Sequence, residues 1–323
     1  MVRALAALDG LSVGDALGEC FLDDDVDARQ RALDRTLPRP PWRFTDDTEM
    51  AIAITEVLAE SGHVSPVALG RAFVRRYMVD PDRGYGPGAH RVLQMLRRGI
   101  PWTEASSSLF GGQGSMGNGG AMRVAPLGAY FADDLLAVIR EARTSARVTH
   151  CHLEGQAGAV AAAVGAAYAC RKRYCPSSVA WMTLLDLAEM LCPPGATRAG
   201  LGKARQLDAS TSPRDAARVL GNGSGLLASD TVPFALWCAQ RHLDDYSHAI
   251  WSTIEGLGDI DTNCAIAGGV VGSNAPPPDE WRKAREPLRF ESDIERGGEP
   301  LALRDRIRSW FWMLRAPKRA NRV

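Results

Sequence analysis

The chain has 323 residues, of which 46% are hydrophobic, so it holds enough apolar material for one large folded domain or two ordinary ones. Lys and Arg together number 38, as do Asp and Glu, and the formal net charge is therefore zero. A balanced chain has no general attraction to nucleic acid or to an anionic membrane surface, so we expect neither as a stable partner.

The cysteines are scattered, without a C-x-x-C pair or a His spacing suited to zinc. They are Cys20, Cys151, Cys170, Cys175, Cys192, Cys238 and Cys264. This pattern is typical of reduced, packed thiols, and because the N-terminus also lacks an apolar segment with a cleavage site, we expect a cytoplasmic protein. The nearly uncharged stretch 155–170 is shorter than the roughly 20 residues that span a bilayer, so it is predicted to be a buried helix.

Helical periodicity runs through almost the whole chain. Apolar residues recur at a spacing near 3.6 in segments 5–20, 50–60, 67–79, 89–98, 135–146, 154–171, 178–191, 215–220, 232–240 and 261–271. No run of β-branched residues alternates for long enough to predict a strand. We therefore predict an all-α fold.

The connections between these helices are short and carry Pro and Gly, with one long exception at 110–122, FGGQGSMGNGGAM. Segments 193–213 and 221–229 are further loop candidates. The NAPPP run at 274–278 closes the helical core, so we predict a domain over residues 1–278 and a C-terminal helical extension over 279–323. The extension is expected to pack on the domain through Trp281, Trp310, Phe311 and Trp312.

The first helix contains GLSVGDALGECF, residues 10–21. Gly14 and Gly18 would let another helix approach closely, and Asp15 and Glu19 lie four residues apart on one face. Taken alone, this is more often a packing motif with two solvated acids. It is also the pattern of a buried general acid or of a residue that orients metal ligands.

A second acidic stretch, WRFTDDTEMAI at 42–52, places Thr45, Asp46 and Asp47 directly ahead of a helix. One interpretation is a helix cap, with Thr45 or Asp46 at the N-cap and Glu49 in capping-box spacing. A cap needs only one side-chain oxygen, however, and adjacent carboxylates at a helix start would be better organised by a divalent cation.

Near the other end, Asp259 and Asp261 are separated by one residue and followed by Thr262. This run could also cap a helix, but in a turn both carboxylates could converge on one cation. Thr45, Asp46, Asp47, Asp259, Asp261 and Thr262 offer only oxygen atoms. Such a set favours a hard cation, Mg²⁺ or Mn²⁺, and two ions a few Å apart could share it.

The Gly-rich segment 110–122 would leave backbone N–H groups open to a phosphate. It lacks the Lys-Ser/Thr pair of a P-loop and the strand context of a dinucleotide fold. The alternative is a flexible connection between two helices.

Five motifs resemble, in this order, those of the ADP-ribosylglycohydrolase family. They are GDALG at 14–18, FTDDTEMA at 44–51, GSMGNGGAMRVAPLG at 114–128, VTH at 148–150 and GDIDTNCAIAGGVVG at 258–272. The resemblance covers residues 5 to about 275. It implies a compact orthogonal multi-helix bundle with a binuclear metal cleft that holds two Mg²⁺ or Mn²⁺ ions, and removal of ADP-ribose from a modified acceptor.

The resemblance also assigns roles to residues. Thr45, Asp46 and Asp47 correspond to one half of the metal shell, and Asp259, Asp261 and Thr262 to the other. Asp15 matches an aspartate close to the metals. Gly114, Ser115, Gly117 and Asn118 match the loop that wraps the diphosphate and distal ribose, Met116 stands where Tyr is common, and His150 matches a residue lining the same pocket.

One position departs from the family pattern. Many members carry a glutamate where this chain has Leu22, so Glu19 is the expected acid-base residue, together with Asp15. The acidic run 23–25 (Asp23, Asp24, Asp25) could substitute for it.

We therefore expect a metal-dependent hydrolase that releases ADP-ribose from a modified protein, nucleic acid or small molecule. Tyr85 and Met116 are expected at the rim that selects the acceptor. One alternative is an ADP-ribose-binding or immunity-type protein with weak or no hydrolysis, and another is a purely structural descendant of the fold. An unrelated metal-dependent phosphohydrolase would release phosphate instead. The intact set of Thr and Asp positions favours catalysis.

Overall fold

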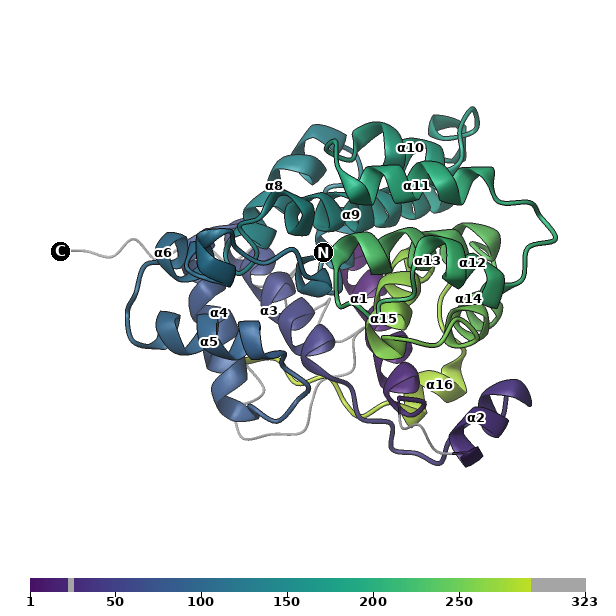
Figure 1. Cartoon of the computed structure of the whole chain (residues 1–323), viewed down its shortest axis with the longest axis horizontal. Coiled ribbons are helices and arrows are strands. Elements are labelled where there is room, and N and C mark those ends of the chain that lie inside the picture. The colour runs from purple at the N-terminus through teal and green to yellow at the C-terminus, as the bar shows by residue number, and fades with distance from the viewer. Residues whose placement is uncertain (23–25, 292–323) are drawn as a thin grey trace.

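The computed structural model describes residues 1–22 and 26–291, and within these ranges the chain is helical (Figure 1). The α-helices are α1 (Val2–Glu19), α2 (Val26–Leu33), α3 (Asp46–Ser61), α4 (Pro66–Val79), α5 (Pro87–Arg97), α6 (Trp102–Ser107), α7 (Ala125–Tyr130), α8 (Leu135–Arg147), α9 (Leu153–Tyr174), α10 (Leu184–Leu191), α11 (Ala196–Gln206), α12 (Pro213–Leu220), α13 (Ala228–Arg241), α14 (Tyr246–Ile254), α15 (Ile260–Gly272) and α16 (Asp279–Ala284). Extended pairing in the described residues is limited to two isolated bridges. The all-α prediction is confirmed.

One helix lies where a loop was predicted, at 193–213. Helix α11 forms there although its sequence, ATRAGLGKARQ, is weakly apolar. The Glu154 carboxylate accepts hydrogen bonds from the amides of Ala196 and Thr197 at 2.6 and 3.0 Å, and so caps the helix from another element. Gly200 brings α11 against Pro233 of α13. Tertiary contacts therefore override a weak local signal.

The predicted helix at 178–191 was also wrong at its start. Residues 176–178 form a single 3₁₀ turn, and α10 begins only at Leu184. Thr183 and Asp186 form a reciprocal capping box at that point, which fixes the first turn. The predictions at 50–60, 67–79 and 135–146 correspond to α3, α4 and α8, with ends shifted by a few residues.

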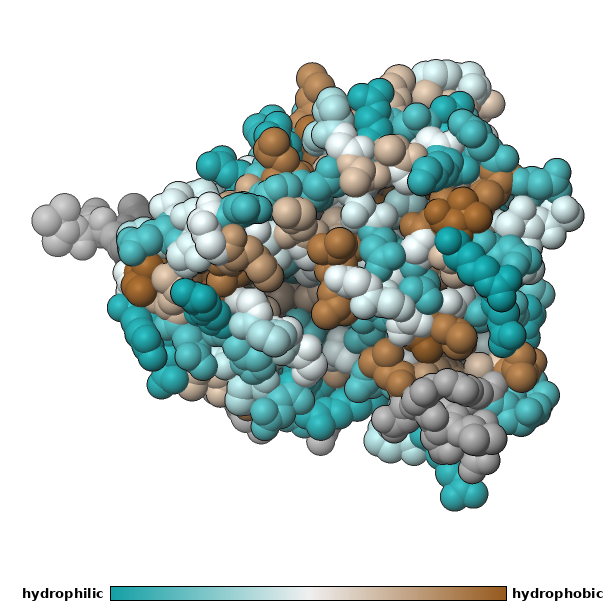
Figure 2. All heavy atoms as spheres, viewed as in Figure 1, coloured by the Kyte–Doolittle hydropathy of each residue, from teal (hydrophilic) through white to brown (hydrophobic). Residues whose placement is uncertain are grey.

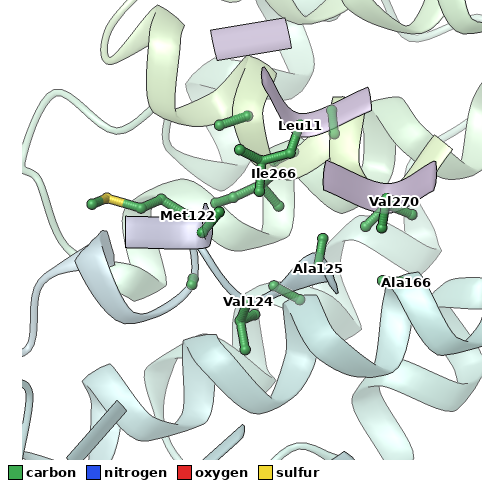
Figure 3. Close-up of a cluster of buried hydrophobic side chains, with 14 of the residues drawn as sticks. Leu11, Met122, Val124, Ala125, Ala166, Ile266 and Val270 are labelled. Atoms are coloured by element: carbon green, nitrogen blue, oxygen red, sulfur yellow. The ribbon is translucent and has the colours of Figure 1, made fainter. Parts of the chain in front are cut away.

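The centre of the fold is the close packing of α1 against α15. A Cβ atom on Gly18 would lie 2.8 Å from the Cα of Asp261, and one on Gly268 would lie 2.6 Å from the carbonyl oxygen of Gly10. Only glycine fits at such distances, so backbone meets backbone along the pair. Figure 3 shows Leu11 of α1 beside Ile266 and Val270 of α15, with residues of α7 and α9 closing the cluster.

The outer helices pack around this pair. Figure 1 shows α4, α5 and α6 gathered at one end of the molecule and α12, α13 and α14 at the other. Helix α9 runs through the interior with residues 155–170 buried, as predicted for that stretch. Polar and apolar residues are interspersed over the face seen in Figure 2.

The described part of the predicted C-terminal extension packs on the domain. Trp281 is buried edge-on against Trp42, Tyr246 and Trp251. The amide of Trp42 donates to the Ala284 carbonyl at 2.7 Å, and the amide of Glu286 donates to the Trp42 carbonyl at 2.8 Å. Trp310, Phe311 and Trp312 lie outside the described residues, so the extension over 279–323 stays a prediction.

All seven cysteines are free. No helix in the described part of the chain has both the length and the apolar content needed to cross a membrane. The cytoplasmic location stays a prediction.

Candidate active site

Asp15 joins α1 to the start of α3. Its carboxylate is fully buried and accepts hydrogen bonds from the amide and hydroxyl of Thr45 and from those of Thr48, at 2.5 to 3.1 Å. Hydrogen bonds to an ionised group are stronger than those between neutral groups. The first turn of α3 is thereby fixed to the middle of the fold.

The capping interpretation of the TDDT run is correct for Thr45, which is the N-cap of α3 and accepts from the Asp47 amide at 3.3 Å. The capping box is not formed, because Glu49 pairs instead with Arg76 at 2.6 Å. Asp46 and Asp47 are buried beyond what the cap requires. One carboxylate oxygen of Asp47 has no hydrogen-bond partner among the described residues.

The second acidic group lies at the start of α15. Asp259 precedes the helix, and its carboxylate accepts a hydrogen bond from the Asn118 side chain at 2.6 Å. Asp261 and Thr262 are buried, and Asp261 Oδ1 has no partner among the described residues. Because Gly18 of α1 contacts the backbone of Asp261, α1 connects the two acidic groups.

Electrostatics show that these carboxyl groups share one region of low polarity. Burial, and then the charge of Asp15, raise the pKa of Asp46 to about 8. Burial, and then the charges of Asp15 and Asp261, raise the pKa of Asp47 well above its usual value. Burial also raises the pKa of Asp15 to about 7. Like charges this close would be stabilised by a bound cation.

A site for such a cation needs several oxygen ligands that converge on one point. Within the described ranges, no group of three or more His, Cys, Asp or Glu side chains is arranged, as it stands, to hold a metal ion. The buried, unpartnered oxygens of Asp47 and Asp261 and the oxygen-only donor set nevertheless fit a hard divalent cation. The fit is one of charge, burial and donor type, and binding would require these side chains to draw together.

The Gly-rich loop lies beside the second acidic group. Asn118 donates its amide to the Leu226 carbonyl at 3.1 Å and its side chain to Asp259, and Gly117 pairs with Leu227. Gly114 has a φ of +78°, and a Cβ there would lie 2.9 Å from the His152 amide nitrogen. The loop is therefore held in place and is not a flexible connection.

The amides of Ser115 and Met116 are adjacent in this loop. Ser115 Oγ accepts from the Gly117 amide at 3.1 Å, whereas the amides of Ser115 and Met116 donate to no described residue. Adjacent free N–H groups at a glycine-rich turn favour an anionic ligand.

His150 packs against the same loop. A Cβ on Gly119 would lie 3.0 Å from His150 Nε2, so the ring fills the space left by the glycine. Burial, and then the charge of Arg123, lower the pKa of His150 to about 3, so the ring is neutral.

Glu19 and Tyr85 differ from their expected settings. Of the two settings considered for the acids of α1, Glu19 has the solvated one, because it is exposed at the end of the helix, whereas Asp15 is buried; the charge of Glu19 acts on Asp261. Tyr85, expected at the rim, is 5% exposed; it packs edge-on against Tyr77, and its hydroxyl has no partner in the described structure. Leu22 is exposed, and residues 23–25 lie outside the described ranges.

Sequence reasoning missed three residues: Thr48, Thr149 and Arg123. Arg123 is fully buried, and its charge acts on Asp46 and Asp47. The available signal was an arginine inside an otherwise apolar run, AMRVAPLG, where a solvated cation is not expected.

Comparisons with known proteins agree on one family. A family model described as ADP-ribosylglycohydrolase matches residues 1–315. The human ADP-ribosylhydrolase ARH3 is 28% identical, over 90% of this chain and 92% of the human protein. An uncharacterized protein of Archaeoglobus fulgidus is 29% identical, over 88% of this chain and 92% of that protein. A solved structure of an ADP-ribosylglycohydrolase-related protein complex is 24% identical in sequence, and the match covers 91% of this chain and 94% of that chain. The TM-score of 0.62 shows that the two chains share the fold.

Proposed function

The chain belongs to the ADP-ribosylglycohydrolase family, whose members hydrolyse ADP-ribose linkages, and we propose that it is a divalent-metal-dependent hydrolase. It would cleave the glycosidic bond between ADP-ribose and a modified acceptor. The observation that supports this most strongly is that two acidic groups, at the starts of α3 and α15, both lie against α1 and that Asn118 joins the second group to the Gly-rich loop.

In this proposal the Gly-rich loop binds the diphosphate. The free amides of Ser115 and Met116 would donate to phosphate oxygens, and the neutral ring of His150 would close the same pocket. Binding energy from this remote part of the substrate would position the bond to be cleaved.

Thr45, Asp46, Asp47, Asp259, Asp261 and Thr262 would hold two Mg²⁺ or Mn²⁺ ions. When bound, such ions supply Lewis acidity that can hold sugar hydroxyls and lower the pKa of a water. Bound cations would favour the ionised form of the chain's carboxylates, most of which are buried and shielded from bulk solvent.

Glu19 is the proposed acid-base residue, because it is exposed to an incoming substrate and its charge acts on Asp261. It would protonate the leaving atom of the acceptor or take a proton from the attacking water while positive charge develops on the ribose. Asp15 is already engaged with Thr45 and Thr48, so we assign it a positioning role.

The substrate would be an ADP-ribosylated protein, nucleic acid or small molecule. Half-buried Met116 and buried Tyr85 remain the proposed acceptor-selecting residues.

A release assay tests the proposal. Purified protein with Mg²⁺ or Mn²⁺ is incubated with arginine-, serine- and base-linked ADP-ribose, and free ADP-ribose is measured with an EDTA control. We expect EDTA-sensitive release from at least one acceptor. Asp261→Ala or Asp46→Ala should abolish release with little loss of fold, and Glu19→Gln should lower the rate and spare metal binding. Asp133→Ala, at an exposed ion pair with Arg3, is the matched control.

Three outcomes would redirect the assignment. Binding of ADP-ribose without release from any acceptor would favour the binding or immunity-type function. Release of phosphate instead of ADP-ribose would indicate a phosphohydrolase. Normal turnover by Glu19→Gln would move the acid-base role to another acid, first to Asp23, Asp24 or Asp25.

A further inference from the structure

A line of three side chains runs from the acidic region to the Gly-rich loop. Arg123 donates from Nη2 to the Thr149 hydroxyl at 2.8 Å and to the Ser145 carbonyl at 3.1 Å. The Thr149 hydroxyl lies 2.7 Å from His150 Nδ1. The guanidinium carbon of Arg123 lies 4.5 Å from the centre of the Phe73 ring, which holds the cation in place.

The hydrogen-bond directions along this line can be deduced. An arginine can only donate, so Thr149 Oγ accepts from Arg123 and keeps its own hydrogen. The only other partner of that hydroxyl in the described structure is Nδ1 of His150. If Nδ1 carried the hydrogen, the buried Thr149 hydroxyl would donate to nothing, which is costly. Nδ1 therefore accepts, and the single ring hydrogen of neutral His150 sits on Nε2.

The Nε2–H group has no partner within the protein. His150 is 9% exposed, and Nε2 donates to no described residue. It faces Gly117 and Gly119, whose added Cβ atoms would lie 3.3 and 3.0 Å away. This donor therefore points at the loop that also carries the amides of Ser115 and Met116.

We propose that Arg123 and Thr149 are positioning residues that fix His150 as the Nε2–H tautomer, so that Nε2 donates a hydrogen bond to an anionic oxygen of the ligand held by the loop. The identity of that oxygen as part of the ADP-ribose diphosphate rests on the proposed function. Without the Thr149 hydroxyl, the ring could place its lone pair toward the ligand, and two electron-rich atoms would then face each other.

The same line ties the loop to the acidic region, because Arg123 is the buried cation whose charge acts on Asp46 and Asp47. Arg123→Lys would keep a charge but lose the planar group that reaches Thr149 and Ser145 together. A lysine should therefore not replace this arginine in positioning His150.

The test combines a spectrum of the free protein with ligand binding. Histidine labelled with ¹⁵N reports which ring nitrogen of His150 is protonated, and calorimetry measures the Kd of ADP-ribose. We expect Nε2–H in the wild type, a mixture of tautomers in Thr149→Val with a roughly tenfold weaker Kd, and recovery of both in Thr149→Ser. ADP should show the same loss as ADP-ribose, because it keeps the diphosphate.

A control variant removes a neighbouring hydroxyl from α8. The Thr144 hydroxyl donates to the Arg140 carbonyl and takes no part in the line from Arg123 to His150. Thr144→Val should therefore leave the His150 spectrum and the Kd of ADP-ribose unchanged.

Protonated Nδ1 in the wild-type protein would overturn the proposal. This measurement needs no variant, so the proposal can be refuted even if Thr149→Val does not fold. Unchanged tautomer or unchanged Kd in folded Thr149→Val would also overturn it. Failure of the wild-type protein to bind ADP-ribose would refute the proposed function and, with it, the assignment of the ligand oxygen to the diphosphate. The spectrum of the free protein would still show which tautomer His150 adopts.

Discussion

Replacement of Gly268 by alanine should separate the two central helices. The added Cβ would lie 2.6 Å from the Gly10 carbonyl oxygen and 2.9 Å from the hydroxyl of Tyr246, which donates to that same carbonyl. Cβ contacts essentially never fall below 3.0 Å, so the increase from 2.6 to 3.0 Å requires α1 and α15 to move apart by at least about 0.4 Å.

The expected loss of stability follows from opposing effects. Alanine in place of glycine within a helix stabilises by about 1 kcal/mol. Overpacking against a backbone costs about 1–3 kcal/mol, and loss of the Tyr246 hydrogen bond adds about 1 kcal/mol. The free energy of unfolding should therefore fall by about 1–3 kcal/mol, or roughly 2–6 °C in Tm for a chain of this size.

Gly70→Ala is the matched control, because Gly70 also lies inside a helix, but an added Cβ there meets Leu96 and Val148 only at 3.7 Å. This variant should raise Tm by about 2 °C, since it keeps the helix gain without the clash. Thermal melts of both variants, followed by the ADP-ribose release assay, make the comparison. Gly268→Ala should also lose activity, because α15 carries Asp261. A Gly268→Ala protein as stable as Gly70→Ala would refute the close-packing argument.

Three further predictions concern other parts of the fold. Burial acts to raise the pKa of Glu154, but hydrogen bonds from Thr197 and Ala196 outweigh it and hold that pKa below its usual 4.5. Glu154→Gln should therefore lower Tm at pH 7. The difference in Tm from wild type should shrink as pH falls below 4.5, because the wild-type carboxylate is then protonated. A difference that grows in acid would contradict the cap. Burial, and then the charges of Asp15 and Asp261, raise the pKa of Asp47, so this carboxyl destabilises the metal-free fold at pH 7, where it is ionised in the unfolded chain. Asp47→Asn should therefore raise Tm at pH 7 without metal and lose the Tm increase on adding Mg²⁺ or Mn²⁺; an undiminished metal response would exclude Asp47 as a ligand. Trp281→Ala should cost about 3–5 kcal/mol in urea unfolding, because the ring is 3% exposed, and an unchanged midpoint would show that the C-terminal segment adds no stability.

The sequence predicted the fold wherever the apolar spacing was strong. The periodic segments of α3 and α8 could be located within a few residues of their ends. Helix α11 could not, because its cap comes from Glu154 and its packing partner is Pro233, both distant in sequence. The apolar spacing within the α11 sequence cannot predict contacts with residues so far away along the chain.

The acidic motifs of the candidate site could be read in the same way, because each combines aspartates with an adjacent threonine, which the Asp-Asp runs at 133–134 and 244–245 and the Asp-x-Asp run at 80–82 lack. The distinction between roles could not be read. Asp15 and Glu19 share one helix face in the sequence, yet Asp15 is buried under Thr45 and Thr48, and Glu19 is exposed. Arg123 was missed because its partner, Thr149, is 26 residues away along the chain.

The pairing of α1 with α15 also affects how the protein can be made. The end of α1, Glu19, and the start of α15, Ile260, are 241 residues apart in sequence. At translation rates of about 5–20 residues per second, α15 begins to be synthesised roughly 12–50 s after α1 is complete. During this time the glycine-lined face of α1 has no α15 to pack against. Long-range pairing of this kind slows folding, and the two acidic groups can meet only after α15 has been synthesised. A nascent chain that stops before α15 has the TDDT half of the site and lacks the other half.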